Sequence, residues 1–422
     1  MRCVNIFACL LILVPGLVWA QTKDDVQEQL RALEERVHVL ESEVQTLKAA
    51  QAAPTPPTQA PPPPTELPPG QAPAAPTQLP PGAPLTPSSP LPVYGGASAA
   101  AKALNPDVSV IGDFIGAGGR NTIRPLPALE MHESEVGLQA IIDPYARGDF
   151  FFTFGEQGVD LEEGYITFTS LPGGFVARVG KMRSSFGVVN TLHNHVLPWI
   201  DRPVVSEDLV GGEDGIDDAG VSVNRILPVP KGIFLEATGQ VFRGDSGDVF
   251  SHTRKSDIST VGRLRAYRDL TESTNLDLGL SFARGHNDLG SAYRTQLYDL
   301  DTTLRWKPLR RAIYHNFLMR SELIWSEREE PSAVQRAFGF YTASDYRLNR
   351  RWTVGGRYDR SGRARNAALT DTGFSGVLTY WPSEFSQLRG QYRFTRYAEG
   401  RDANEFLFQF LFVLGAHGAH PF

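Results

Sequence analysis

From Asp107 to its C-terminus, the chain is divided into segments of nine to sixteen residues in which polar and apolar side chains alternate. A period of two predicts β-strands, because successive side chains of a strand point to opposite faces of the sheet. In the last segment, 404–414, five large apolar groups share one face: Phe406, Phe408, Phe410, Phe412 and Leu414. A soluble sheet would have to bury that face, whereas a membrane barrel exposes it to lipid. The alternation therefore favours a transmembrane barrel.

The alternating segments number sixteen, and breaks rich in Gly, Pro, Asp and Asn separate them. The predicted strands are 107–116, 129–142, 148–156, 161–170, 174–183, 217–227, 232–243, 258–269, 273–284, 292–307, 314–327, 334–346, 350–359, 370–381, 384–396 and 404–414. An even number returns both ends of a barrel to the same side of the membrane. Tight breaks such as 171–173 and 382–383 alternate with longer polar ones, such as 117–128, 244–257 and 360–369. Short periplasmic turns and long outer loops would give this rhythm.

The N-terminus has the features of a secretory signal peptide. Arg2 precedes an apolar run that extends from Val4 to Val18. The sequence Val18-Trp19-Ala20 fits a signal-peptidase site, so we predict cleavage after Ala20. Both cysteines lie within this segment, so the exported chain is expected to have no disulfide and no thiolate metal site. No later apolar run reaches the roughly eighteen residues that a spanning helix needs.

Two distinct segments separate the signal from the alternating region. Apolar residues spaced 4, 3, 4, 3, 4, 3 form a heptad pattern: Val26, Leu30, Leu33, Val37, Leu40, Val44 and Leu47. The pattern predicts a short coiled coil that promotes oligomerisation, and a lone amphipathic helix is the alternative. From Ala52 to Pro92 the chain holds seventeen of its thirty-one prolines. Such a segment favours extended polyproline II and, at about 3.1 Å per residue, could span on the order of 120 Å.

Together these features predict an all-β fold, a transmembrane antiparallel β-barrel of about sixteen strands over residues 105–422. A signal peptide (1–20), a periplasmic α-helical coiled coil (21–50) and a Pro/Ala-rich linker (51–104) would precede it. Outer-membrane lipid is the expected surrounding of the barrel, with the N-terminal segment in the periplasm. The terminal Phe422 resembles the signal that the barrel-assembly machinery recognises. A formal net charge of −6 argues against nucleic acid as a partner.

The break between Arg183 and Asp217 is the longest, at thirty-three residues. A long ordered loop in a compact fold is usually functional. Its candidate constriction residues are Phe186, His193, His195, Trp199, Arg202, Glu207 and Asp208. We expect this loop to fold into the lumen and narrow the pore, and a surface loop outside the mouth is the alternative.

The sequence Gly180-Lys181-Met182-Arg183, followed by Phe186-Gly187, resembles the phosphate-selective porin (porin O/P-like) family of Gram-negative outer-membrane barrels. In that family a Gly-Lys strand ends in a Phe-Gly pair before the long loop. The signal, the coiled coil and the closing aromatic strand extend the resemblance over the mature chain in outline. It implies a passive, trimeric porin, although valine at the a positions and leucine at d favour a dimer. The family's anion-binding residues do not align one by one, so its phosphate selectivity is not implied.

The polar faces of the predicted strands indicate a charged, water-filled lumen. The candidate pore-lining residues are Arg263, Arg265, Asp299, Asp301, Arg305, Arg320, Glu322, Arg357, Arg389 and Arg393. Rows of guanidinium groups select anions in pores. Alternatively, the acids and arginines neutralise one another in pairs across the lumen. The sequence leaves both readings open.

Metal and catalytic motifs receive little support. His193 and His195, and likewise His417 and His420, have a spacing that can suit a metal ion, but neither pair has a carboxylate or cysteine at ligand spacing. We therefore predict no metal site and no cofactor. The chain has no Gly-x-Ser-x-Gly or His-Glu-x-x-His motif and no supported triad, so no enzymatic activity is expected.

The leading hypothesis is an oligomeric outer-membrane porin that passes small polar solutes by diffusion. A preference for phosphate-like anions is part of this hypothesis. One alternative is a barrel that anchors an envelope tether, with the coiled coil contacting the cell wall. A channel for a metal or another specific solute, and an outer-membrane hydrolase, are the remaining alternatives.

Overall fold

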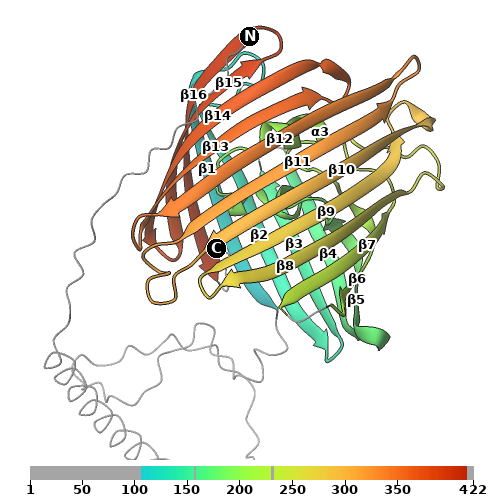
Figure 1. Cartoon of the computed structure of the whole chain (residues 1–422), viewed down its shortest axis with the longest axis horizontal. Coiled ribbons are helices and arrows are strands. Elements are labelled where there is room, and N and C mark those ends of the chain that lie inside the picture. Colours follow the sequence, from blue (N-terminus) through green and yellow to red (C-terminus); the bar gives the residue numbers. More distant parts are fainter. Residues whose placement is uncertain (1–105, 156–157, 230–231, 416–422) are drawn as a thin grey trace, which may run out of the picture. The chain divides into compact units, whose positions relative to one another are not determined.

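The computed structural model describes residues 106–155, 158–229 and 232–415. They form a closed antiparallel barrel of sixteen strands, in which β1 (Asp107–Arg120) pairs with β16 (Arg401–Gly415) to complete the circle (Figure 1). The other strands are β2 (Leu129–Asp143), β3 (Ala146–Gly155), β4 (Gly158–Leu171), β5 (Phe175–Arg183), β6 (Asp217–Leu227), β7 (Ile233–Phe242), β8 (Ser259–Thr271), β9 (Thr274–Asn287), β10 (Gly290–Trp306), β11 (Phe317–Glu329), β12 (Val334–Arg347), β13 (Trp352–Arg363), β14 (Asn366–Ser383) and β15 (Ser386–Tyr397). The predicted signal peptide, coiled coil and linker, and Phe422, lie outside the described residues.

The predicted antiparallel barrel is confirmed, and its strands coincide with the sixteen alternating segments to within a few residues at their ends. The predicted loop rhythm is wrong in one place. Residues 360–369 belong mostly to β13 and β14, where Arg363 donates to Asp371 across the two strands at 3.0 Å. These polar groups satisfy each other within the sheet and do not mark a loop. At the opposite end, the connection 307–316 is longer than a tight turn.

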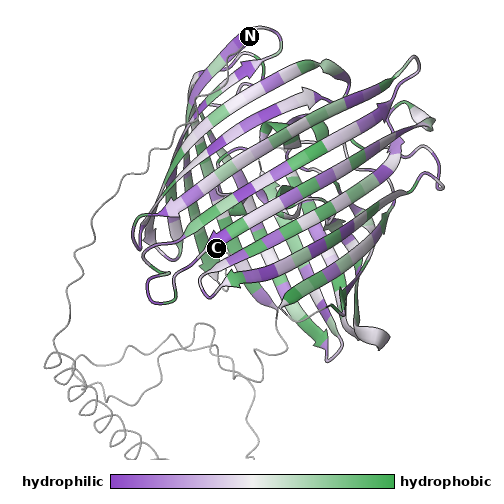
Figure 2. Ribbon diagram, viewed as in Figure 1, coloured by the Kyte–Doolittle hydropathy of each residue, from purple (hydrophilic) through white to green (hydrophobic). Residues whose placement is uncertain are grey.

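Hydrophilic and hydrophobic residues alternate along the strands, as the colours in Figure 2 show. On β16, the outward-facing Phe406 and Leu414 are 58% and 60% exposed, whereas the inward-facing Leu407 and Gln409 are each 1% exposed. Exposed apolar surface costs about 25 cal/mol per Å² in water. The outer face is therefore suited to hydrocarbon. No helix among the described residues is long and apolar enough to cross a membrane.

Candidate functional site: the loop inside the barrel

The loop between β5 and β6, residues 184–216, folds into the interior and contacts the far wall. It contains two short 3-10 turns, η2 (Val189–Thr191) and η3 (Asn194–Val196), and a short helix, α3 (Val204–Leu209). In Figure 1, α3 is visible behind β11 and β12, and its residues contact β11 to β14. We name residues 184–216 the luminal loop, because they lie inside the barrel and not outside its mouth.

Glu322 on β11 holds the beginning of the luminal loop. Its Oε1 accepts hydrogen bonds from the backbone N–H groups of Val188 and Val189, each at 2.7 Å. Arg263 on β8 donates to the carbonyl oxygen of Gly187. Gly187 has a φ of +59°, and a Cβ there would lie 3.0 Å from Glu322 Oε2. Glycine therefore permits the turn and the close approach to the wall.

Apolar side chains of the luminal loop pack against the inner wall of the barrel and form a hydrophobic core with it. Trp199 is fully buried, and its ring meets that of Tyr341 on β12 edge-on, with the centroids 5.4 Å apart. The guanidinium of Arg357 lies 4.8 Å from the centre of the Trp199 ring. Further members of this core are Phe186, Val189, Leu197, Val205, Leu209, Ile216, Phe242, Phe250, Leu297 and Ile324. Burying each large apolar side chain contributes about 1.5–3 kcal/mol, so the loop is packed in place.

Asp201 fixes the middle of the luminal loop to β13 and β15. Its Oδ2 accepts from Arg357 at 2.9 Å and from Arg393 at 3.0 Å, and its Oδ1 accepts from Gln391 at 2.5 Å. Burial alone would raise the pKa of Asp201, but the two guanidinium groups and the amide outweigh it and lower the pKa to about 2. Arg389 adds a bond from Nη1 to the carbonyl oxygen of Trp199 at 3.2 Å.

Arg202 closes the luminal loop on itself. It donates to Asn194 Oδ1 at 2.9 Å and to the carbonyl oxygens of Val189 and Leu192 at 3.0 and 2.7 Å. Burial lowers the pKa of Arg202 to about 10, with a smaller contribution from the like charge of Arg183. The guanidinium of Arg202 thus holds Val189, Leu192 and Asn194 of the luminal loop together.

The remaining predicted loop acids lie on α3, where Asp208 accepts from Arg124 at 2.6 Å. Glu207 precedes it on the same helix. Lys181, from the motif that resembles the phosphate-selective porins, lies 3.2 Å from Asp217 and 3.3 Å from Asp160. Lys181 thus links β5 to β4 and β6 next to the ends of the luminal loop, and Arg124 holds α3.

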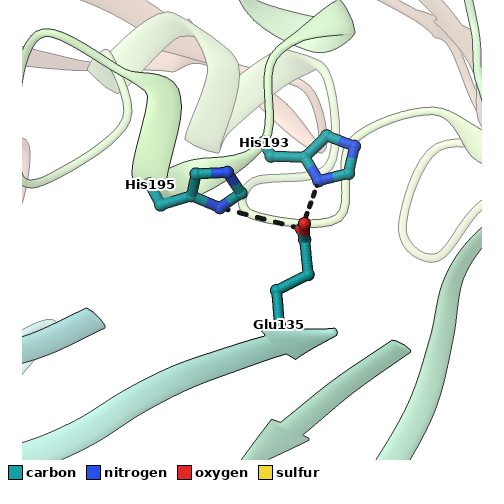
Figure 3. A group of neighbouring side chains, drawn as sticks. All are labelled: Glu135, His193 and His195. Atoms are coloured by element: carbon teal, nitrogen blue, oxygen red, sulfur yellow. Dashed lines mark hydrogen bonds and ion pairs between the residues drawn. The ribbon is translucent and has the colours of Figure 1, made fainter. Parts of the chain in front are cut away.

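Four glutamates of β2 and β4 surround the two histidines of the luminal loop. We name this group the Glu–His cluster: Glu133, Glu135, Glu162, Glu163, His193 and His195. His193 Nδ1 lies 2.7 Å from Glu135 Oε2, and His195 Nδ1 lies 3.7 Å from the same oxygen (Figure 3). Burial would lower the pKa of His193, but the hydrogen bonds to the glutamates outweigh it and raise the pKa well above its usual value.

A β-bulge explains how both Glu162 and Glu163 face the interior. Phe151 pairs with Glu163 and Phe152 with Leu161, so Glu162 is an extra residue in β4. Sequence reasoning missed the carboxylate partners of the histidines because Glu135 and Glu163 are 58 and 30 residues away from His193. The one available signal was Glu162-Glu163, which interrupts the alternation of its strand.

Most of the predicted pore-lining arginines face the interior in ion pairs. The pairs, with their N–O distances, are Arg263–Asp301 at 2.7 Å, Arg265–Asp277 at 2.5 Å, Arg305–Asp277 at 3.5 Å, Arg357–Asp359 at 2.8 Å and Arg393–Glu405 at 2.6 Å. Asp299 is buried between Asp301 and Glu322 in the same wall. Within the described part of the chain, Arg320 and Arg389 make no ion pair within 4.0 Å. The neutralising arrangement thus applies to most, but not all, of these arginines.

Two interior cavities have opposite charge. The cavity at the end of the 307–316 connection is lined by five basic side chains: Arg305, Lys307, Arg320, Arg347 and Arg389. Asp345 is the one carboxylate among the described residues that line it. The cavity at the end where the luminal loop begins is lined by three basic side chains, Lys181, Arg183 and Arg243, and by nine acids: Glu130, Glu133, Asp160, Glu162, Glu213, Asp214, Asp217, Asp218 and Asp245. The first cavity favours anions and the second cations.

The barrel is similar to solved outer-membrane proteins. A loop-deletion mutant of OmpT of Vibrio cholerae has a TM-score of 0.52 at 10% identity and covers 74% of this chain and 100% of its own. An anion-selective porin from Comamonas acidovorans has a TM-score of 0.51 at 10% identity, covering 73% and 99%. OprB of Pseudomonas putida has a TM-score of 0.51 at 9% identity, covering 74% and 94%. These likenesses show a porin-like barrel fold.

One relative is similar to this chain in amino-acid sequence. No family model matches the chain. An uncharacterized protein of Aquifex aeolicus (strain VF5) is 30% identical over 387 residues, which covers 76% of this chain and 81% of that protein. The chain therefore belongs to the family of this Aquifex aeolicus protein, and its fold is a porin-like barrel of sixteen strands.

Proposed function

We propose that this chain is an outer-membrane channel through which small polar solutes diffuse, with the luminal loop as its constriction. The observation that supports the proposal most directly is the anchoring of a thirty-three-residue loop to the inner wall of a closed barrel. A loop held at Glu322 and at Asp201 narrows the lumen at a fixed position and leaves charged cavities on either side.

The outer face supports the membrane location. Large apolar groups are exposed around the whole barrel, for example Val221, Leu280, Trp325, Phe374 and Phe406. Such a surface is unfavourable in water and favourable in lipid, while the inward face is polar enough to hold water. The strands leave no open sheet edge in the described barrel, as spanning by strands requires.

We further propose a preference for anions, which the basic cavity favours. Most interior arginines are neutralised by a neighbouring carboxylate, so they contribute little net potential. Arg320 and Arg389 line the basic cavity outside such ion pairs, and they are the best candidates for attracting an anion. The solved structure described as an anion-selective porin has the same kind of fold, although its low identity transfers no residue role.

The test is single-channel recording of the refolded full chain in planar bilayers. We expect stepwise conductance and, in a salt gradient, a reversal potential that indicates anion preference. The double variant Arg320→Ala/Arg389→Ala should shift the reversal potential towards cations. Arg336→Ala is the matched control, because its side chain is 73% exposed and pairs with Glu327. No conductance from folded protein would refute the channel, and an unchanged reversal potential would refute the anion preference alone.

A further inference from the structure

The Glu–His cluster brings four carboxylates together inside the barrel. The guanidinium of Arg183 lies 2.5 Å from Glu162 at its nearest contact, and the imidazole of His193 contacts Glu135, Glu162 and Glu163. Arg183 also donates its backbone N–H to Glu163 at 2.7 Å. Glu133 is only 9% exposed, and its Oε2 has no hydrogen-bond partner. A buried carboxylate oxygen without a partner is costly, and a cation would satisfy it.

The possible metal-binding atoms of the cluster form two groups that share Glu135. Glu135, His193 and His195 each offer one donor within 4.8 Å of the others, and Glu133, Glu135 and Glu162 form a second such group. His193 Nδ1 is 2.7 Å from Glu135 Oε2 and 3.3 Å from Glu162 Oε2. Ligands about 2.1 Å from a tetrahedral metal lie roughly 3.4 Å apart, so these separations need only small adjustments.

Glu163 supplies the support that a metal-bound histidine requires. Its Oε2 lies 2.8 Å from Nε2 of His193, on the side of the ring away from Glu135. A carboxylate that accepts the Nε2 proton leaves Nδ1 as the metal-binding atom and fixes the orientation of the ring. The arrangement of carboxylate, imidazole and convergent oxygens is therefore already assembled.

We propose that His193, His195 and Glu135 bind a divalent transition-metal ion of the Zn²⁺ class, with Glu162 as the fourth ligand. Imidazole and carboxylate donors suit Zn²⁺, Ni²⁺ and Co²⁺, whereas Ca²⁺ and Mg²⁺ favour oxygen ligands alone. Binding would link the luminal loop to β2 and β4. This site goes beyond diffusion of solutes through the channel.

The acidic cavity provides a route to this site. Glu133 and Glu162 line that cavity together with Asn194, which lies between the two histidines in sequence. The many carboxylates of the cavity raise the local concentration of cations. The proposed ligand is therefore a small divalent cation that binds nitrogen donors. It would enter from the end of the barrel where the luminal loop begins.

The experiment measures Zn²⁺ binding to the metal-free, folded full chain in detergent by equilibrium dialysis. We expect one Zn²⁺ per chain, with His195→Ala and Glu135→Gln each weakening the affinity at least tenfold. Glu163→Gln should weaken it about 10- to 100-fold, as is typical of residues that orient a ligand. The Glu→Gln variants keep the side-chain shape, and heat-dependent gel mobility checks that each variant is folded.

Two control variants separate this site from other histidines. His252→Ala removes a histidine that lies near Asp245, and the double variant His417→Ala/His420→Ala removes those of the C-terminal tail. Both should bind one Zn²⁺ with unchanged affinity. The proposal is overturned if the wild type binds no Zn²⁺, if His195→Ala and Glu135→Gln bind as the wild type does, or if the tail variant abolishes binding. Because dialysis does not depend on conductance, its result is independent of whether the channel proposal holds.

Discussion

Asp201 connects the middle of the luminal loop to two strands that are far from it in sequence. Its carboxylate bonds with Arg357 and Arg393, and each arginine also keeps a carboxylate of its own wall, Asp359 or Glu405. Removing the charge of Asp201 would therefore release the loop while leaving each guanidinium paired. This separates the role of Asp201 from the general cost of an unpaired buried charge.

The variant Asp201→Asn should lower the free energy of unfolding by about 1.5–3 kcal/mol, the range for hydrogen bonds to charged groups. It should also increase current noise in single-channel recordings, because the loop is less firmly held. Denaturant unfolding in detergent measures the first effect. Asp248→Asn is the control, since that side chain is 83% exposed and its pair with Arg365 should contribute less than about 1 kcal/mol. Equal effects of the two substitutions would contradict the assignment.

The contribution of Asp201 should disappear at acid pH. Its folded-state pKa of about 2 lies below the ordinary value of about 3.9, so its ionised form is favoured by folding. The stabilisation is complete above about pH 5 and is lost as the pH falls through 4 to 2. The difference in unfolding free energy between wild type and Asp201→Asn should shrink over that window. A difference that stays constant down to pH 2 would show that ionisation of Asp201 does not contribute.

Individual residues show what the sequence could and could not predict. The two-residue period placed Arg263, Arg357 and Arg389 on the interior face, because side-chain direction is a local property of a strand. Asp201 was missed, because its partners follow more than 150 residues later and no local pattern marks them. The carboxylates around His193 were missed for the same reason. Contacts within the lumen depend on barrel closure, which local sequence does not encode.

At the level of the elements, β16 shows how much the sequence does specify. Its alternation predicted one lipid-facing and one interior face, and the structure exposes Phe408 while it buries Leu407 and Gln409. The error over 360–369 arose because Arg363 and Asp371 look like loop residues until their strands are paired. Strand existence is therefore readable from periodicity, whereas strand ends depend on cross-strand partners.

Phe408→Arg should test the lipid-facing side of β16. Phe408 lies near the middle of the strand, so a charge there would enter hydrocarbon at a cost of about 2–4 kcal/mol. We expect a lower yield of heat-modifiable protein in the outer-membrane fraction, and Phe408→Leu should behave as the wild type. If the arginine variant assembles equally well, this face does not lie against the membrane interior.

The luminal loop is the second element whose removal is informative. β5 and β6 remain paired up to Arg183 and Asp217, so a short Gly/Ser linker in place of residues 188–212 can still join them. We expect the barrel to fold and its single-channel conductance to rise, because the constriction is gone. Deletion of Leu309–Arg311 from the connection at the other end is the control and should leave conductance nearly unchanged. A conductance equal to that of the wild type would mean that the loop does not limit the current.

For the whole molecule, the described strands close the sheet between β1 and β16. β1 and β16 pair without a register shift from Ser109 with Gly415 to Arg120 with Asn404. The coiled coil predicted for residues 21–50 and the linker predicted for residues 51–104 lie outside the described residues, so their role stays a prediction. The heptads of the predicted coiled coil, from Val26 to Leu47, predict that the chain forms a homo-oligomer.

Deletion of residues 21–92 should therefore separate pore formation from assembly. The truncated barrel should keep the conductance of one pore, because strand closure is intact. Its mass in detergent should fall from an oligomer towards a monomer if heptad packing stabilises the complex, and three heptads are close to the minimum for such packing. Light scattering measures the mass, and Leu33→Ala/Leu40→Ala in the full chain should weaken assembly without changing the pore. An unchanged oligomer in both variants would place the assembly contacts on the barrel wall, where the exposed aromatic side chains offer the surface for it.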